Sequence, residues 1–328
     1  MFFQIIFALY ILLNIYLYLR LRKFFSRGWQ RILYAFGYLF LVLAFPMAEI
    51  VEHRAHSLWW QPVLWIGFLS LPYQLYLFLT SLLLDSLWGV NRLLKRLPPS
   101  QRYQNPLRKK QIWILLLLPA VVVLAGHLNL YHLSVQRYHI QIPRKESARS
   151  HLRLAVASDF HLHDMTASSF VHRFVDRINA LEVDALLIPG DMLEGDGNTP
   201  RLQAWQRQFC DIKTTFGVYA TLGNHDTHGR RIRTDFFDAA RITLLQDTVV
   251  VINNAFALAG RNDNRVRNRK TMASLLPTPR PRLPLIVMDH RPTDLEAICA
   301  AGADLAVSGH THYGQLFPFN FIVDALYE

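Results

Sequence analysis

The chain of 328 residues is long enough for two domains, and its charge is divided unevenly between them. Residues 1–150 hold 17 of the 35 Lys and Arg residues but only 4 of the 24 Asp and Glu residues. Because the second half is near-neutral and its basic run Arg261–Lys270 is interpreted as a solvated loop, we expect no nucleic-acid partner. Cys210 and Cys299 are too few for a disulfide framework or a zinc ribbon. They are predicted to be buried free thiols, with a single bridge as the alternative.

Four stretches of the first half are long and apolar enough to cross a bilayer, which takes about 20 residues. They are Phe2–Leu19, Ile32–Val51, Val63–Leu84 and Ile112–Leu128. The first has neither a basic segment before it nor a small-residue cleavage site, so it is predicted to be a retained span rather than a signal peptide. Residues 1–130 are therefore predicted to be a membrane region with four transmembrane helices. We interpret it as an anchor rather than a transporter because the spans lack a buried cluster of charges.

The short loops between these spans predict an orientation. Five basic residues follow the first span and seven lie between the third and fourth, whereas the loop between the second and third has only Arg54 beside Glu49 and Glu52. Basic loops face the cytoplasm, which places the second half of the chain on the opposite side. The sequence thus predicts a multi-pass protein of the cell membrane with an extracytoplasmic C-terminal domain.

Residues 131–150 are predicted to be a polar linker with an edge strand at Tyr138–Ile142, and residues 151–328 a separate domain. Strand-like and helix-like patterns alternate in that domain, which favours an α/β fold with a largely parallel sheet. The expected strands are Leu152–Ser158, Ala185–Pro189, Val218–Leu222, Leu283–Met288 and Asp304–Ser308, and the expected helices are Ser168–Leu181, Leu202–Lys213, Arg231–Ala240 and Thr293–Ala301. Three clustered strand-like runs, Ile242–Leu245, Val249–Ile252 and Ala255–Ala259, suggest a second sheet packed on the first.

Five of the expected strands end in residues that can bind a metal ion. They lead into Asp159 and His161, into Gly190-Asp191, into Gly223-Asn224-His225-Asp226, into Asp289-His290, and into Gly309-His310-Thr-His312. Ligands of open α/β sheets gather at the carboxyl ends of strands, so we expect these side chains to converge. Asp, His and Asn donors without Cys suit Mn, Fe or Zn, and their number suits two divalent ions better than one. Asp-x-His and Gly-Asp alone arise often by chance, whereas Gly-Asn-His-Asp and Gly-His-Thr-His after a strand are more specific. The five in order are not expected by chance.

Two divalent ions about 3.5–4 Å apart are suited to phosphoester hydrolysis, since they lower the pKa of a bridging water and neutralise the phosphoryl oxygens. Asp191, which follows the flexible Gly190, is the natural carboxylate to bridge both ions. His225 directly follows a predicted ligand and is better placed to protonate the leaving group or to stabilise the transition state.

The motifs Ser-Asp-x-His, Gly-Asp, Gly-Asn-His-Asp, His-x-Pro and Gly-His-Thr-His resemble those of the calcineurin-like metallophosphoesterase superfamily, in particular its bacterial membrane-anchored branch. The resemblance runs from about Tyr138 to Leu316. It implies a four-layered α-β-β-α sandwich with two metal ions, and it implies that His225 is the catalytic histidine. It further implies that the first ion is bound by Asp159, His161, Asp191 and His312 and the second by Asp191, Asn224, His290 and His310.

Three features depart from the usual pattern of that branch. Tyr313 stands where a glycine is usual, which places a ring at the mouth of the site. Arg291 lies beside His290 and is interpreted as a surface residue, with pairing to a substrate phosphate as the alternative. The chain stops soon after one more strand-like run, Phe319–Ala325, so the sandwich is expected to be C-terminally incomplete, with impaired activity as a consequence.

The leading hypothesis is a membrane-anchored metal-dependent phosphohydrolase. The linker would keep the site near the headgroups, so membrane lipids are the expected partners and a phosphorylated lipid or lipid-linked precursor the expected substrate. The alternative is a membrane protein whose second domain binds metal or a phosphorylated ligand without turnover. The fold by itself does not choose among the substrate classes of the superfamily.

Overall fold

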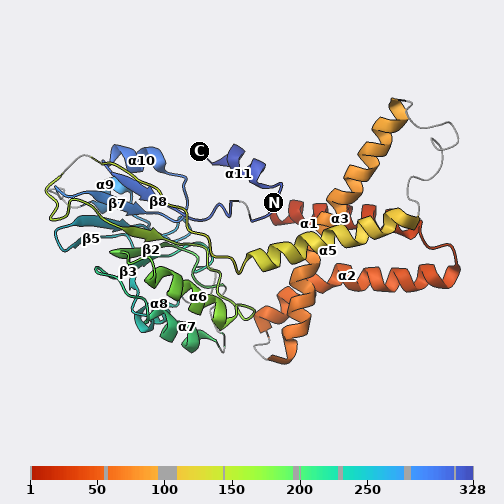
Figure 1. Ribbon diagram of the computed structural model, residues 1–328, viewed down its shortest axis with the longest axis horizontal. Helices are drawn as coiled ribbons and strands as arrows, with labels where there is room; N and C mark the ends of the chain where they lie inside the picture. The colour runs from red at the N-terminus through yellow and green to blue at the C-terminus, as the bar shows by residue number, and fades with distance from the viewer. Residues whose placement is uncertain are drawn as a thin grey trace. The chain divides into compact units, whose positions relative to one another are not determined.

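The computed structural model describes residues 2–54, 58–94, 109–142, 145–194, 199, 201–227, 232–276, 282–313 and 315–327 (Figure 1). Most of the basic loop predicted between the third and fourth spans lies outside these residues, as do Arg231 and Glu328. The chain divides into two units, Met1–His132 and Leu133–Glu328.

The first unit consists of long apolar helices. They are α1 (Phe2–Arg22), α2 (Gly28–Arg54), α3 (Gln61–Leu93) and α5 (Lys109–Asn129), with a short 3-10 helix at Leu58–Trp60. Each long helix contains a segment that is long and apolar enough to cross a membrane: Gln4–Arg22, Gly28–Glu52, Gln61–Leu93 and Ile112–Asn129. The four predicted spans therefore all lie in helices, which extend beyond most of the predicted bounds.

Side chains from all four long helices meet in a small core. Leu17 of α1, Tyr38 of α2, Leu77 of α3 and Leu115 of α5 are buried there. Gly67 lies against the backbone of α2 so closely that a Cβ would overlap Ala44 and Ala48. Such close contact of small residues is typical of helix packing in membranes.

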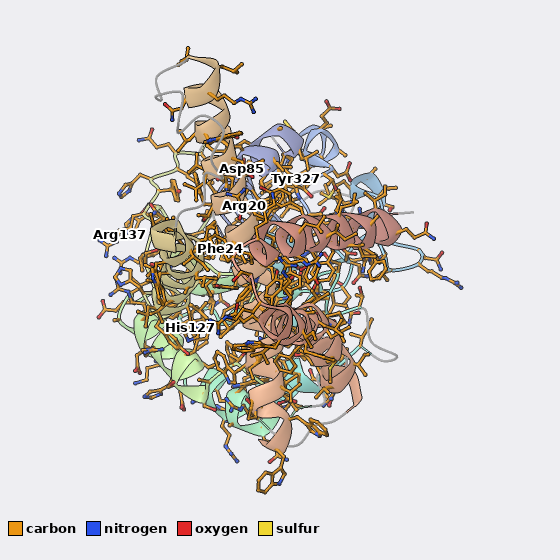
Figure 2. All side chains as sticks on the ribbon, turned by 90° about the vertical axis from the view of Figure 1, so that its right-hand side faces the viewer. Arg20, Phe24, Asp85, His127, Arg137 and Tyr327 are labelled. Atoms are coloured by element: carbon orange, nitrogen blue, oxygen red, sulfur yellow. The ribbon has the colours of Figure 1, made fainter. Side chains whose placement is uncertain are left out.

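A charged pair lies between α1 and α3 (Figure 2). Arg20 forms an ion pair with Asp85, and the Tyr16 hydroxyl donates a hydrogen bond to Asp85 Oδ2 at 2.6 Å. The Arg20 side chain is buried. The predicted spans end at Leu19 and Leu84, one residue before this pair, and the helices continue past those ends and bring the pair into the bundle. A single ion pair is not the buried cluster of charges that would mark a transport path.

The second unit contains two four-stranded sheets. The first is parallel, in the order β1 (Leu154–Val156), β2 (Ala185–Pro189), β3 (Val218–Thr221) and β4 (Thr243–Leu244). The second has the order β5 (Thr248–Ile252), β6 (Phe256–Gly260), β7 (Leu285–Met288) and β8 (Leu305–Val307), with only the β5–β6 pair antiparallel. Figure 1 shows α6 (Ser168–Asn179), α7 (Leu202–Phe209) and α8 (Thr234–Ala239) on one side of the sheets and α9 (Met272–Leu275) and α10 (Leu295–Ala300) on the other.

Three apolar layers hold this unit together, and the strands divide their side chains between them. On β2, Leu186 and Ile188 face the layer that contains Phe174 and Trp205 of α6 and α7. Leu187, between them in sequence, faces the layer between the two sheets. A third layer joins the second sheet to α9 and α10. This alternation follows from the two-residue period of a strand and confirms the predicted α/β fold with its α-β-β-α layers.

The structure corrects several predicted elements. Tyr138–Ile142 is irregular rather than an edge strand, and Tyr138 is 79% exposed, so the apolar alternation there has no sheet to join. Residues 319–325 do not form a strand, because helix α11 (Asn320–Leu326) covers most of them. The first of the three clustered strand-like runs, β4, belongs to the first sheet, whereas β7 and β8 belong to the second. The predicted helices exist but are shorter, and α9 was not foreseen.

Two further expectations about side chains are wrong. Arg261 is not part of a solvated loop: its guanidinium is buried and bonds to Asp289 at 2.9 Å and to Asp294 at 2.7 Å. Cys210 and Cys299 are free thiols as predicted, but Cys299 is exposed and Cys210 only half-buried.

Candidate metal centre

The loops after five strands lie side by side, because the hydrogen-bonding pattern continues past the strand ends. The His161 amide donates to the carbonyl of Asp191 at 3.0 Å, which holds the loop after β1 beside the loop after β2. The Gly309 amide donates to the carbonyl of His290 at 3.0 Å, which does the same for the loops after β8 and β7. Ligand-type side chains from both sheets are thereby brought to one edge of the sandwich.

One group of ligand-type atoms comes from Asp159, His161, Asp191 and His312, and all four atoms lie within 4.8 Å of one another. The Nε2 atoms of His161 and His312 are 3.1 Å apart. His312 Nε2 lies 3.3 Å from Asp159 Oδ1, and His161 Nε2 lies 3.6 Å from Asp191 Oδ2. These are the four residues that the sequence assigns to the first ion.

A second group contains Asp191, His290 and His310 within the same distance limit of 4.8 Å. His290 Nε2 lies 3.2 Å from Asp191 Oδ2 and 3.2 Å from Asn224 Oδ1. The structure therefore brings together all the residues that the sequence assigns to the second ion. Asp191 is shared by both groups.

The buried carboxylate of Asp191 indicates what these groups require. Its Oδ2 atom is buried and has no hydrogen-bond donor among the residues that the structure describes, although His161 Nε2 and His290 Nε2 face it from either side. A buried anionic oxygen without a partner is costly. Cations on its two sides would compensate it, so the donor set fits a pair of divalent ions.

The backbone of the site is unusual in the same place. Asp159, His161, Asp191, His310 and His312 have φ angles of 57°, 43°, 55°, 72° and 47°. Left-handed backbone is uncommon for residues other than glycine and costs on the order of 1–3 kcal/mol at each position. Such residues gather where the surrounding structure imposes a functional geometry.

The glycines of the motifs allow the backbone to approach the ligands. A Cβ on Gly223 would overlap the Asp191 carboxylate, and a Cβ on Gly309 would overlap Asp159 and Ser158. Gly190 has a φ of 91°, and a Cβ there would overlap the His290 ring. These positions therefore require glycine for space, and Gly190 requires it for conformation as well.

Hydrogen bonds orient the ligand atoms. His290 Nδ1 donates a hydrogen bond of 2.9 Å to the carbonyl of Pro189, which leaves Nε2 directed at Asp191. Asp191 Oδ1 accepts a bond of 2.8 Å from the amide of His225. His312 Nδ1 lies 2.8 Å from Gln315 Oε1. Partners of this kind fix the tautomer and the ring orientation of metal-binding histidines.

Glu194 is a residue of the site that the sequence analysis missed. Its Oε2 atom lies 2.7 Å from His161 Nδ1, and its Oε1 atom lies 2.7 Å from His225 Nδ1. One carboxylate thus holds both a predicted ligand and the predicted catalytic histidine. Its signal in the sequence is an acidic residue three positions after Asp191, in the loop that already carries a ligand.

The pKa values of the site reflect these pairings. Burial by itself would raise the pKa of Glu194, but the hydrogen bonds from His161 and His225 outweigh it and lower the pKa below its usual range. The same balance, with His312 and Ser158 as the partners, lowers the pKa of Asp159 to about 2. The hydrogen bond with Glu194 raises the pKa of His225. The carboxylates are therefore ionised throughout the physiological range, as metal binding requires.

Arg291 is mostly buried rather than on the surface. Its Nε donates to Asp263 Oδ2 at 2.7 Å, and the Asp263 carboxylate is itself buried. Burial, followed by the positive charges of Arg291 and His290, lowers the pKa of His310 to about 4. Arg291 therefore acts electrostatically on the second group of ligands.

An open pocket adjoins the first group of ligands. It has a volume of about 490 Å³ and is lined by Ser158, Asp159, Ser308, Gly309, Thr311, His312, Tyr313 and Gln315. The Tyr313 ring is exposed and lines this pocket, in agreement with its predicted place at the mouth of the site.

Comparison with known proteins gives the family. Residues 152–314 match the family model of the calcineurin-like phosphoesterases. An uncharacterized metallophosphoesterase of Helicobacter pylori is 29% identical over 178 residues, covering 52% of this chain and 47% of that protein, so the chain spans about half the length of this relative. The UDP-2,3-diacylglucosamine pyrophosphatase LpxG of Chlamydia trachomatis is 23% identical over 247 residues, or 59% of this chain and 73% of that protein.

The match to a further relative covers most of that relative's length. An uncharacterized metallophosphoesterase of Aquifex aeolicus is 30% identical over 207 residues, which are 60% of this chain and 77% of that protein. Residues 152–314, which match the family model, contain every residue of the two groups of ligand-type side chains. The chain belongs to the calcineurin-like phosphoesterase family.

Proposed function

We propose that this protein is a membrane-anchored phosphohydrolase that uses two divalent metal ions. The observation that carries the proposal is the buried Asp191 Oδ2, which lies between a histidine of each ligand group and has no hydrogen-bond donor among the described residues. A carboxylate in this position can bridge two cations. When bound, such ions supply the positive charge that activates water and stabilises the phosphoryl oxygens.

In this proposal the ligands divide as the sequence suggests. Asp159, His161, Asp191 and His312 hold one ion, and Asp191, Asn224, His290 and His310 hold the other. Mn, Fe and Zn all suit this set of oxygen and nitrogen donors.

His225 is proposed as the catalytic acid. Its Nδ1 bonds to Glu194 at 2.7 Å, so Nε2 is the nitrogen that would reach the leaving group of a substrate. The Glu194 carboxylate raises the pKa of His225, which keeps the imidazole protonated at higher pH. A protonated histidine can then donate its proton to the departing alkoxide.

The proposed substrate is a phosphorylated lipid or a lipid-linked phosphoester, acted on outside the cytoplasm. Three observations support this choice: the four helices that could cross a membrane, the basic loops beside them, and the chlamydial relative whose name specifies a diacylglucosamine pyrophosphatase. A periplasmic reporter enzyme fused after Leu316 should be active, and activity of a cytoplasmic reporter there would contradict the orientation.

The experiment is an assay of the full chain in detergent with Mn²⁺ and bis(p-nitrophenyl) phosphate, a soluble diester, alongside its monoester. We expect metal-dependent hydrolysis that is lost in Asp191→Ala and in His225→Ala. His172→Ala is the matched control, because that histidine is exposed on α6 and belongs to neither group of ligand-type side chains. Two bound metals per chain without hydrolysis of either ester would refute the enzymatic proposal and favour a binding function.

A further inference from the structure

An exposed apolar surface adjoins the candidate metal centre. We define it by Tyr313, Leu316, Phe317, Phe321, Ile322 and Leu326, which lie on α11 and the loop before it. The rings of Phe317 and Phe321 are in contact, with centroids 6.0 Å apart. Ile322 and Leu326 are four residues apart on the helix and therefore project from the same side. The surface thus contains two pairs of neighbouring apolar side chains rather than single ones.

The size of this surface lies in the range of the largest apolar patch on a typical monomer. Tyr313, Phe317 and Phe321 are 61%, 64% and 63% exposed. With about 200 Å² for each aromatic side chain, these three residues alone expose roughly 380 Å². The largest patch on a monomer, roughly 300–600 Å², is often a functional one.

Both ends of this segment are attached to the metal centre. Before α11, Gln315 lies within hydrogen-bonding distance of His312, at 2.8 Å. After α11, the Tyr327 ring packs edge-on against the His310 ring, with centroids 6.2 Å apart. Tyr313 belongs both to the apolar surface and to the lining of the pocket. Whatever covers this surface therefore also lies over the mouth of the site.

The chemistry of the segment favours a lipid bilayer as the occupant. Residues 313–323 contain no Asp, Glu, Lys or Arg, and Asp324 is the one charged residue of α11. Specific protein partners are usually recognised by polar groups around an apolar centre, whereas an interfacial membrane segment needs aromatic and aliphatic side chains and no buried charge. A protein bound to this surface would also block the entrance of the pocket to substrate. A bilayer bound to the same surface would instead bring lipid headgroups to that entrance.

The chain itself supplies a bilayer for this surface, because four helices of the first unit are long and apolar enough to cross one. The segment between α5 and β1 is partly attached to the domain: the Glu146 amide donates to the Arg282 carbonyl at 2.9 Å, and the Ala148 amide donates to the Asn254 carbonyl at 2.8 Å. The segment therefore keeps the domain close to the membrane, and the aromatic surface favours one of its faces.

We infer that this apolar surface docks the catalytic domain onto the membrane that anchors the chain, so that the metal centre opens toward lipid-embedded phosphoesters. The inference rests on the proposed function for its substrate, but the docking itself can be measured without catalysis.

The experiment uses the full chain in phosphatidylcholine nanodiscs that contain a lipid with a nitroxide near its headgroup. A fluorophore is attached at Phe321→Cys, and in a second protein at Phe317→Cys, after Cys210 and Cys299 have been replaced by Ser. The matched control is a label at Val251→Cys, because Val251 is a 51% exposed apolar residue on β5. We expect the nitroxide lipid to quench labels 317 and 321 at least threefold more than label 251.

Equal quenching at all three positions would overturn the inference. Labels at 317 and 321 that are shielded from aqueous iodide but not quenched by the nitroxide lipid would also overturn it, since a protein surface would then be the occupant. Hydrolysis of the soluble diester is measured on the same samples. Loss of that activity with lipid quenching intact would count against the proposed function and leave the docking standing.

Discussion

Replacing Glu194 by Gln tests whether one carboxylate organises both halves of the candidate site. Each oxygen of Glu194 lies 2.7 Å from the Nδ1 atom of a histidine, His161 on one side and His225 on the other. Gln has only one acceptor oxygen, so its amide group must face one of the two rings. That ring then loses its acceptor and is driven toward the tautomer that carries the proton on Nε2.

The magnitude follows from the single hydrogen bond that is lost. A hydrogen bond to a charged group contributes about 1.5–3 kcal/mol, and each 1.4 kcal/mol is tenfold in an equilibrium or rate constant. We therefore expect kcat/KM to fall between about tenfold and about 100-fold. If the amide faces His161, the Mn²⁺ concentration needed for half-maximal activity should rise. If it faces His225, kcat should fall and the alkaline limb of its pH profile should move to lower pH, because Glu194 raises the pKa of His225.

The assay is hydrolysis of the soluble diester over a range of Mn²⁺ concentrations and pH values. Glu296→Gln on α10 is the control, since it makes the same chemical change at an exposed position. A Glu194→Gln protein whose kcat/KM stays within threefold of the parent, with unchanged metal dependence and pH profile, would refute this account of Glu194.

Four further predictions concern other parts of the chain. If the Arg291 guanidinium contacts substrate, Arg291→Gln should raise KM for phosphoesters about tenfold and leave kcat little changed, because a charge-assisted hydrogen bond contributes about 1.5 kcal/mol. An unchanged KM would mean that Arg291 has only a structural role, through its bond to Asp263. Gly223→Ala should abolish tight metal binding, measured by metal analysis after dialysis, because a Cβ would overlap the Asp191 carboxylate. The pKa of Asp159 in the folded chain, about 2, lies below the unfolded value of about 3.9, so its stabilisation is present above pH 4 and lost as pH falls toward 2. The melting temperature of metal-free protein should therefore fall in acid, and Asp159→Asn should flatten that part of the profile. Asp85→Asn should lower the free energy of unfolding in detergent by about 1–3 kcal/mol, which is less than for a fully buried pair because Asp85 is about one third exposed. Adding Arg20→Gln should restore part of the loss, because the buried positive charge is then removed as well.

The convergence of the candidate ligands could be foreseen because their signal is local. Asp191 and His290 each lie two positions after the end of a buried strand, and the rule that ligands gather at the ends of strands needs no knowledge of which strands are neighbours. Glu194 could not be foreseen in this way. Its role exists only because His161 and His225, 64 positions apart in the numbering, converge on it in space, and no spacing along the chain records that convergence.

The errors in the fold have a similar cause. The run Phe319–Ala325 is short and apolar, and such a run is compatible with a strand or with a helix; α11 forms where no neighbouring strand pairs with it. The runs from β4 to β6 look alike in sequence, but β4 pairs with β3 while β5 pairs with β6. Pairing is a long-range property, so the division into two sheets could not be obtained from the pattern of each run.

The candidate ligands come from both sheets of the sandwich. Asp159, His161, Asp191 and Asn224 follow strands of the first sheet, whereas His290, His310 and His312 follow strands of the second. Each proposed ion would thus have donors from both sheets, and the pair would add a cross-link to the apolar layer and to hydrogen bonds such as that between His290 and the Pro189 carbonyl. Withdrawal of metal by a chelator should for that reason loosen the sandwich first at this rim, with faster amide exchange along β2 and β7 than along β5. The side chains proposed to bind the metal ions for catalysis would then also stabilise the packing of the two sheets against each other.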